Sequence, residues 1–265
     1  QGDIRDRAFL DGLFSREHVD AVIHFAANSL VGESMKLPLK YYDNNLCGTK
    51  TLLEAMVAHG VDKIVFSSTA AVYGEPERVP ISEDDRTAPT NTYGETKLAM
   101  ERMFHWVSDA HGLGYVSLRY FNACGAHESG DIGEAHQPET HLIPIAIQAA
   151  LGVRPHLAIY GDDYPTRDGT CVRDYIHVND LASAHILAVK YLENGGAPDR
   201  FNLGNGEGFT VREILSAVER VSGRSIETKM DERRAGDPAT LVANSEKARR
   251  VLGFVPRYTQ IEEIV

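Results

Sequence analysis

The sequence contains few cysteines and no long apolar run. Its 265 residues include only Cys47, Cys124 and Cys171, and none of them forms a C-x-x-C pair. This spacing argues against a disulfide framework and favours a reducing cytoplasm. No apolar stretch approaches the roughly 18 residues that a membrane-spanning helix needs. We therefore expect a cytoplasmic protein without a membrane partner.

Positive charge is also scarce, because 27 lysines and arginines stand against 38 acidic residues and leave a formal net charge of −11. Such a field repels polyanions, so we expect no nucleic-acid partner. A small anionic ligand would need local arginines. The length and the 43% of hydrophobic residues allow a large core, either in one α/β domain or in two lobes.

Both ends of the sequence look cut. It opens on Gln1-Gly2-Asp3 without an initiator methionine. It stops just after Thr259-Gln-Ile-Glu262, a capping-box pattern whose helix has hardly begun. We expect a truncated N-terminus and a slightly truncated C-terminus.

Strands and helices are expected to alternate in the first half of the chain. The expected elements are strands at 20–27, 62–68 and 115–121 and helices at 44–59 and 92–111. The strands are short apolar runs, the helices have apolar residues at helical spacing, and Gly60 and Gly112 follow as C-caps. This alternation predicts a doubly wound parallel α/β sheet.

The composition changes after Asn122, where a loop rich in Gly, His, Glu and Pro runs from Cys124 to His141. A loop of this length is usually functional or a domain boundary. We therefore expect one domain at 1–122 and a smaller α/β lobe at 123–265, with about 174–193 packing back on the first domain. The lobe is expected to contain helices at 144–152 and 180–193, strands at 157–160 and 201–203, and a helix capped by Thr210 and Glu213.

The sequence Tyr93-Gly-Glu-Thr-Lys97 places a phenol and an ammonium four residues apart, on one face of a predicted helix. A nearby positive charge favours the phenolate and lowers the pKa of tyrosine, so the pair predicts a tyrosine that acts as a base. Thr69, which ends the apolar run Phe66-Ser-Ser, would add a hydroxyl to the same proton path. Taken alone, this spacing is also common on ordinary solvated helices.

A second motif, Gly204-Asn-Gly206-Glu-Gly208, resembles a dinucleotide loop but lacks its last glycine, since position 209 is Phe209. We interpret it as a tight turn between a strand and a helix. Gly2-Asp3-Ile4 is a better cofactor signal, because an acidic residue just after a third strand can lie beside an adenine.

The set of motifs resembles the extended short-chain dehydrogenase/reductase family and, within it, the UDP-glucose 4-epimerases. The resemblance rests on His24-Phe-Ala-Ala27, Val31-Gly-Glu-Ser34, Tyr41-Tyr-Asp-Asn-Asn45, Phe66-Ser-Ser-Thr69, Val72-Tyr-Gly74, Tyr93-Gly-Glu-Thr-Lys97, Arg119-Tyr-Phe-Asn122, Asp162-Asp-Tyr-Pro-Thr166, Val172-Arg-Asp-Tyr-Ile-His-Val178, Asn202-Leu-Gly204 and Arg233-Arg-Ala-Gly-Asp237. It implies a Rossmann-type sheet of order 3-2-1-4-5-6 whose first βαβ unit, with the glycine-rich turn, is absent from this sequence.

The resemblance implies NAD as cofactor and a UDP-sugar as substrate. For the cofactor it implies Asp3, Ile4, Phe25, Ala26, Ala27, Ser29, Asn44, Thr69, Tyr93, Lys97 and Phe121. For the substrate it implies Asn122, His141, Leu142, Ala158, Ile159, Tyr160, Arg173, Arg234, Asp237 and Leu241. The alternative for Arg173 is a structural ion pair with Asp174, and for Leu241 it is a place in the core.

The implied reaction is the reversible C4 epimerisation of UDP-glucose and UDP-galactose through a 4-keto sugar and transient NADH. Tyr93 would be the acid and base at the 4-hydroxyl, Lys97 would bind the nicotinamide ribose, and Thr69 would assist. Related dehydratases place an acidic pair after the position of Thr69. Here Ala70-Ala71 follow, and a methyl group cannot transfer a proton, so epimerisation is favoured.

Several alternatives stay open at this point. The substrate could be another nucleotide sugar, such as an N-acetylhexosamine, a pentose or a uronic acid, or the chain could be a non-catalytic nucleotide-binding fragment. The resemblance also implies a homodimer that pairs through the helices at 44–59 and 92–111. No metal is expected, because His127, His136 and His141 show no metal-ligand spacing and are interpreted as polar loop residues.

Overall fold

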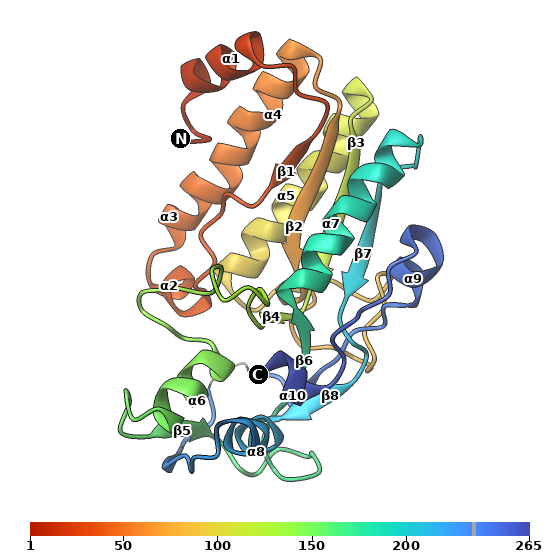
Figure 1. Ribbon diagram of the computed structural model, residues 1–265. Helices are drawn as coiled ribbons and strands as arrows, with labels where there is room; N and C mark the ends of the chain where they lie inside the picture. The colour runs from red at the N-terminus through yellow and green to blue at the C-terminus, as the bar shows by residue number, and fades with distance from the viewer. Residues whose placement is uncertain (235–236) are drawn as a thin grey trace. The chain divides into compact units, whose positions relative to one another are not determined.

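A computed structural model describes residues 1–234 and 237–265 of the chain (Figure 1). Ala235 and Gly236, which lie inside the Arg-Arg-Ala-Gly-Asp motif, fall outside the described residues. The chain forms two compact units. The first contains Gln1–Glu75, Glu83–Tyr120 and Ala184–Asn202, and the second contains Pro76–Ser82, Phe121–Ser183 and Leu203–Val265.

The first unit is built on a four-stranded sheet (Figure 1). The strands are β1 (Val22–His24), β2 (Lys63–Thr69), β3 (Gly114–Tyr120) and β7 (Asp199–Leu203), in the order β1-β2-β3-β7. β1 runs parallel to β2 with His24 opposite Phe66, and β2 runs parallel to β3 with Thr69 opposite Tyr120. The predicted parallel α/β sheet is therefore confirmed, although β1 is shorter than the expected strand at 20–27.

The helices of this unit follow local sequence signals. They are α1 (Arg7–Arg16), α2 (Val31–Lys36), α3 (Pro38–Tyr41), α4 (Gly48–His59), α5 (Thr92–His111) and the second part of α7 (Val178–Glu193). α5 has the predicted bounds, because Asn91 caps its first turn through the N–H of Gly94 and Gly112 ends it in the left-handed region. The helix expected from Asn44 starts instead as a π-helix, Tyr42–Cys47, that leads into α4.

Helices α5 and α7 cover opposite faces of this sheet. Tyr115 of β3 lies against Phe104 of α5, with ring centroids 6.0 Å apart. Its neighbour Gly114 lies against Leu192 of α7. Because successive residues of a strand point to opposite faces, the two helices must lie on either side of β3. The sheet is therefore wound on both faces, as predicted.

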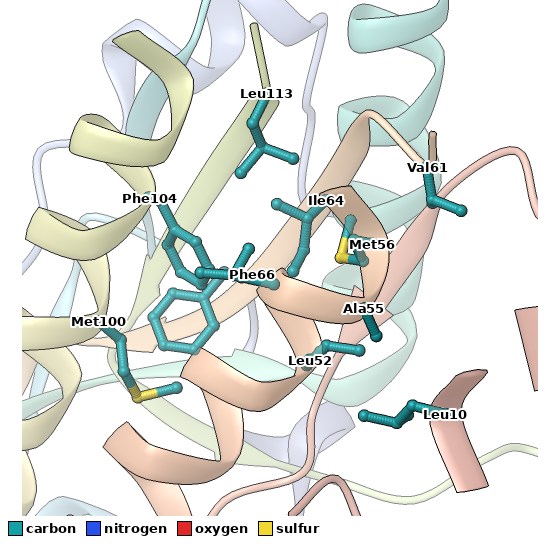
Figure 2. Packing of buried hydrophobic residues seen from close by; sticks show 11 residues of the cluster. Leu10, Leu52, Ala55, Met56, Val61, Ile64, Phe66, Met100, Phe104 and Leu113 are labelled. Carbon is teal, nitrogen blue, oxygen red and sulfur yellow. The ribbon is translucent and has the colours of Figure 1, made fainter. Parts of the chain in front are cut away.

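The core on the α5 side joins α1, α4, α5, β2 and β3 (Figure 2). Phe66 and Phe104 meet edge to face at its centre, with centroids 4.9 Å apart, and both side chains are fully buried. Met56 and Leu52 of α4 pack on the same cluster. This packing fixes α5 against β2, and these two elements carry the predicted catalytic residues.

The second unit has β6 (Val172–His177) at the centre of its larger sheet. β4 (Asn122–Cys124) and β10 (Thr240–Leu241) run parallel to β6, and β8 (Gly208–Thr210) runs antiparallel to it. β5 (Leu157–Tyr160) and β9 (Thr228–Asp231) form a separate parallel pair. The helices are α6 (Leu142–Ala150), α8 (Val211–Ser222), α9 (Glu246–Leu252), α10 (Ile261–Ile264) and the first turns of α7.

Local predictions in this unit had mixed outcomes. The capping box of Thr210 and Glu213 is confirmed at the start of α8. The capping box predicted at Thr259 is wrong, because α10 begins after Gln260 and its cap makes no side-chain hydrogen bond. The turn predicted at Gly204–Gly208 is present, but it leads from β7 into β8 rather than directly into a helix. None of the described helices is long and apolar enough to cross a membrane.

Candidate active site

Tyr93 lies in the first turn of α5, where several polar groups hold it. Its backbone N–H donates to Ser34 Oγ at 3.1 Å, and its phenol is hydrogen-bonded to the Thr69 side chain. Thr69 is the last residue of β2, and its hydroxyl also accepts the N–H of Ala71 at 3.1 Å. The phenol and the threonine hydroxyl therefore meet beyond the carboxyl end of a parallel strand, where open α/β sheets bind their ligands.

Lys97 lies one turn further along α5 and is only 2% exposed. Its Nζ donates to the carbonyl of Ser67 at 2.7 Å and lies 4.7 Å from the centroid of the Phe66 ring. The same nitrogen is 5.8 Å from the centroid of the Tyr93 ring. The structure thus brings together Thr69, Tyr93 and Lys97, the three residues predicted to be catalytic.

The expected pKa of Tyr93 needs a correction. Burial raises the pKa of its phenol, and the hydrogen bond from Thr69 lowers it by less. Burial also lowers the pKa of Lys97 to about 7, against a smaller opposing effect of Glu101. The sequence predicted that the charge of Lys97 lowers the pKa of Tyr93, but in these residues desolvation is the larger effect and raises it, and sequence spacing does not report desolvation.

The segment that follows β1 carries the predicted cofactor residues Phe25, Ala26, Ala27 and Ser29. Phe25, Ala26 and Ser29 are exposed, and the Phe25 side chain is 58% exposed beside His185 with ring centroids 4.7 Å apart. This segment leaves the carboxyl end of β1, next in the sheet to the strand that carries Thr69. It offers open backbone at the place where a dinucleotide would lie.

Other predicted cofactor residues lie near the start of α4. Ile4 lies beside Gly48, and Asp3 is paired with Arg5, which also reaches Asp43 at 2.6 Å. Asn44, in the π-helix, donates to the side chain of Asn45 at 3.1 Å. Phe121 differs from these residues, because it is buried and belongs to the second unit.

In the second unit, predicted substrate residues form a connected chain of contacts. The Arg173 guanidinium pairs with the Asp237 carboxylate, and the N–H of Asp237 donates to the carbonyl of Arg234 at 3.2 Å. The guanidinium carbon of Arg234 lies 4.0 Å from the centroid of the Tyr160 ring. The group therefore contains two arginines and one aromatic ring. A site that binds a ligand with negative charge and a planar ring would require these residue types.

The structural alternative for Arg173, a pair with Asp174, is not what the structure contains. Asp174 is fully buried and accepts the backbone N–H groups of Asn205, Gly206 and Ala243 at 2.8 to 3.0 Å. Burial raises the pKa of its carboxyl to about 6, and these three hydrogen bonds oppose the rise. Asp174 thus holds the turn at Asn205 and Gly206 and the backbone at Ala243, and the arginine beside it in sequence has a different partner.

The remaining substrate candidates are placed differently. Leu241 is directly opposite Arg173 in the sheet register, so the two side chains lie on the same face of the sheet. Asn122 is exposed, and its side-chain amide donates to the carbonyl of Asp174 at 2.8 Å. Ala158 is half-buried, but the side chain of Ile159 is 2% exposed and packs in the core. Ile159 can therefore offer a ligand only its backbone.

His141 and Leu142 lie at the start of α6. The ring nitrogen Nδ1 of His141 is 2.8 Å from a carboxylate oxygen of Glu139 and 2.7 Å from one of Glu134, and the side chain is 47% exposed. Leu142 packs partly on the core beneath α6. The predicted role of Leu142 as a ligand contact would thus compete with a packing role.

A family model described as the NAD dependent epimerase/dehydratase family matches residues 1–204. The chain belongs to this family. The UDP-glucose 4-epimerase of Halalkalibacterium halodurans is 59% identical over 264 residues, which are 100% of this chain and 79% of that protein. The UDP-glucose 4-epimerase of Lacticaseibacillus casei is 59% identical over 265 residues, with coverage of 100% and 80%.

Solved structures of the epimerase/dehydratase family agree closely with this fold. The UDP-glucose 4-epimerase of Brucella ovis in complex with NAD has a TM-score of 0.97 at 49% identity and covers 100% of this chain and 81% of that one. The enzyme of Bifidobacterium longum in complex with NAD⁺ and UDP has a TM-score of 0.94 at 42% identity, with coverage of 100% and 79%. The expectation that a βαβ unit precedes this chain stays a prediction.

For a member of this family, the residues after Thr69 bear on the type of reaction. Ala70 and Ala71 form a short 3₁₀ turn, and the oxygen of Ala71 would lie 2.5 Å from a Cβ on Gly94. Glycine is therefore required at the second residue of the Tyr93 motif. The two methyl side chains offer no acid or base, in agreement with the expectation from the sequence.

Sequence reasoning missed a buried network behind Lys97. Glu101 lies one turn after Lys97 on α5, and its carboxylate accepts the Ser68 hydroxyl and the Arg119 guanidinium, whose Nε is at 3.0 Å. Arg119 also donates to Tyr73 Oη at 3.0 Å. Ser68 stands between Ser67 and Thr69, so this carboxylate fixes the end of β2 against α5. Its position four residues after Lys97 was the available signal.

A second missed residue is Asn45, which is fully buried. Its side chain accepts the N–H of Asn28 at 2.7 Å and donates to the carbonyl of Asn28 and to Thr96 Oγ1, each at 3.1 Å. It thus ties the segment after β1 to the helix that carries Tyr93. The sequence motif pointed to its neighbour Asn44 as the cofactor residue.

Proposed function

We propose that this chain carries out the reversible C4 epimerisation of UDP-glucose and UDP-galactose, with NAD as cofactor. The observation that carries the proposal is the meeting of Tyr93, Thr69 and Lys97 beyond the carboxyl end of β2. The two UDP-glucose 4-epimerases described above, each 59% identical and aligned with 100% of this chain, support the same conclusion.

The residues of the first unit fit a dinucleotide. The exposed backbone of Phe25 to Ser29 would hold its diphosphate and ribose side, Asp3 and Ile4 would approach the adenine, and Asn44 and Lys97 would bind ribose hydroxyls. When bound there, NAD would supply a positively charged ring for hydride transfer at the sugar C4. A positive charge beside Tyr93 would also lower the pKa that burial raises.

The residues of the chain then perform the proton transfer. Tyr93 as phenolate removes the proton of the sugar 4-hydroxyl. Thr69 donates a hydrogen bond to the sugar 4-oxygen and stabilises the negative charge that develops there. The proton stays on the Tyr93 oxygen while the 4-keto sugar turns about its diphosphate link. Tyr93 then returns it to the 4-oxygen on completion, so the reaction has no net redox change.

The second unit is proposed to anchor the nucleotide rather than the sugar. Arg173 and Arg234 carry the charge that a diphosphate requires, and Tyr160, with the backbone of Ala158 and Ile159, would meet the uracil. Asn122 and Asp237 would bind the phosphate and ribose side. Residues 1–122 would then be the cofactor part of the enzyme and 123–265 the substrate part, except that residues 184–202 belong to the first unit and residues 76–82 to the second. His141 would offer its second ring nitrogen, Nε2, because Nδ1 is engaged by carboxylates.

The test is to incubate the full-length protein with UDP-galactose and NAD and to measure UDP-glucose. We expect Tyr93→Phe to lower kcat by about 10²- to 10⁴-fold, because it removes the group that transfers the proton. Tyr191→Phe is the matched control, since the Tyr191 hydroxyl on α7 donates to the backbone carbonyl of Ala197 at 3.0 Å. An unimpaired Tyr93→Phe enzyme would refute the assignment of the base.

Leu241 is proposed to set the tolerance for N-acetylated sugars. It is half-buried and shares a sheet face with Arg173, and a leucine leaves more room than a tyrosine. We expect Leu241→Tyr to lower activity on UDP-N-acetylglucosamine and to retain activity on UDP-galactose. Equal rates for the variant and the parent on the N-acetyl sugar would support a core role for Leu241.

A homodimer that pairs through α4 and α5 is also proposed. Val57 of α4 is exposed, and Trp106 of α5 is 67% exposed, so both helices present apolar groups to solvent. Sedimentation of the full-length protein would report a monomer if this proposal were wrong. Localisation in the cytoplasm stays a prediction from the cysteine pattern.

A further inference from the structure

Four side chains of the loop before α6 converge on one point, and His141 is the one of them that also belongs to the proposed substrate site. Nδ1 of His136 lies 2.5 Å from a carboxylate oxygen of Glu134, and Nδ1 of His141 lies 2.7 Å from the same oxygen. Glu139 approaches His141 Nδ1 at 2.8 Å. One ligand atom from each of the four residues lies within 4.8 Å of every other.

The charge of the group favours a cation at its centre. The Glu139 side chain is only 7% exposed, and one of its oxygens accepts the backbone N–H groups of Thr140 and His141 at 2.7 and 2.8 Å. Two carboxylate groups therefore face two imidazole rings.

The donor set selects among metal ions. Two imidazole nitrogens and two carboxylate oxygens suit Zn²⁺, whereas Mg²⁺ and Ca²⁺ prefer oxygen ligands alone. Bonds of about 2.0 to 2.1 Å would place tetrahedral ligand atoms about 3.3 Å apart, so the close pairs must separate by roughly 0.5 to 0.8 Å to admit the ion. Residues 125–141, all of them described, form no helix or strand that would resist this movement.

We propose that Glu134, His136, Glu139 and His141 form a Zn²⁺ site that fastens the loop to the start of α6. Each Nδ1 that now donates to a carboxylate would bind the ion instead, with its proton on Nε2 or released. The ion would hold the His141 ring by Nδ1 and direct Nε2 away from the cluster. Glu134 and His136, which lie in the irregular stretch between β4 and α6, would gain a fixed position.

The competing explanation is a network of histidine–carboxylate hydrogen bonds without metal, and Zn²⁺ titration separates the two. The full-length protein is freed of metal with a chelator and titrated with ZnCl₂ in competition with a chromophoric chelator, without substrate. We expect one tightly bound Zn²⁺ per chain and at least about 100-fold weaker binding for His136→Gln and for Glu134→Gln, because each loses one of four ligands. Zn²⁺ should also raise the thermal midpoint of the parent and not that of the variants.

His127→Gln is the matched control. His127 lies in the same loop and its Nδ1 contacts Ser129 at 2.9 Å, outside the cluster, so this variant should bind Zn²⁺ as the parent does. Co²⁺ in place of Zn²⁺ should give the visible absorption of a tetrahedral site in the parent and in His127→Gln only. A parent that binds no stoichiometric Zn²⁺, or a His136→Gln protein that binds it equally well, would overturn the proposal. Neither result depends on epimerase activity.

Discussion

The buried amine of Lys97 makes a specific prediction about stability. Its pKa falls from the ordinary value of 10.5 to about 7 because burial disfavours the charged form. This depression corresponds to about 5 kcal/mol against the ammonium in the folded chain. Below pH 7 both folded and unfolded chains carry the proton, and the folded chain bears this cost in full.

Between pH 7 and pH 10.5 the folded chain has lost the proton and the unfolded chain still holds it. The unfolded state then binds more protons, so the free energy of unfolding rises with pH in this window. From about pH 7 to about pH 9.5 the contribution of Lys97 should become more favourable by about 3 kcal/mol. Lys97→Met has no proton to lose and should not show this contribution.

The assay is urea unfolding of the nucleotide-free parent and of Lys97→Met at pH 7 and at about pH 9.5. The free energy of unfolding of the variant is subtracted from that of the parent at each pH, so that the contributions of other titrating groups cancel. This difference in the free energy of unfolding should rise in favour of the parent by about 3 kcal/mol as pH rises. Lys50→Met removes an exposed lysine of α4 that pairs with Glu54, and its difference from the parent should stay within about 0.5 kcal/mol. A difference between parent and Lys97→Met that is flat, or that falls with pH, would refute the assignment of a depressed pKa.

Two further predictions concern the elements that position Tyr93. Glu101→Gln leaves Arg119 buried without its anion, so it should lower the free energy of unfolding by about 3 to 5 kcal/mol in chemical denaturation. A loss below about 1 kcal/mol would contradict the stabilising role of this buried ion pair. Gly94→Ala should lower kcat, because its Cβ would meet the oxygen of Ala71 at 2.5 Å. Gly12→Ala is the control, because a Cβ at residue 12 would meet no atom within 4 Å and should instead stabilise α1 by about 0.5 to 1 kcal/mol. Equal kcat values for the two variants would argue against a steric requirement at residue 94.

The elements that the sequence predicted well are those with local signals. α5 was predicted to the residue because Asn91 and Gly112 lie at its ends, and the box of Thr210 and Glu213 marks α8 in the same way. The π-helix at Tyr42–Cys47 was not predicted, since its residues have the same periodicity as the α-helix that follows.

The site was predictable in its residue types but less so in its electrostatics. Spacing placed Tyr93 and Lys97 on one helix face, yet the pKa of each depends on burial by distant segments. The pairing of Glu101 with Arg119 needs the register of β3 against α5, which no local pattern encodes. The convergence of His136 and His141 on Glu134 depends on an irregular loop, for which no periodicity exists.

Strand β6 has a consequence for the kinds of mutation that the protein can tolerate. Arg173 and Asp174 are adjacent, and they point to opposite faces. Arg173 points toward Asp237, and Asp174 points toward the backbone N–H groups of Asn205 and Ala243. Deletion of one residue within β6 would exchange the two faces, bury a guanidinium among backbone N–H groups and remove the carboxylate that they need. A single-codon deletion there should therefore abolish folding, whereas the same deletion in the irregular stretch at 128–132 should be tolerated.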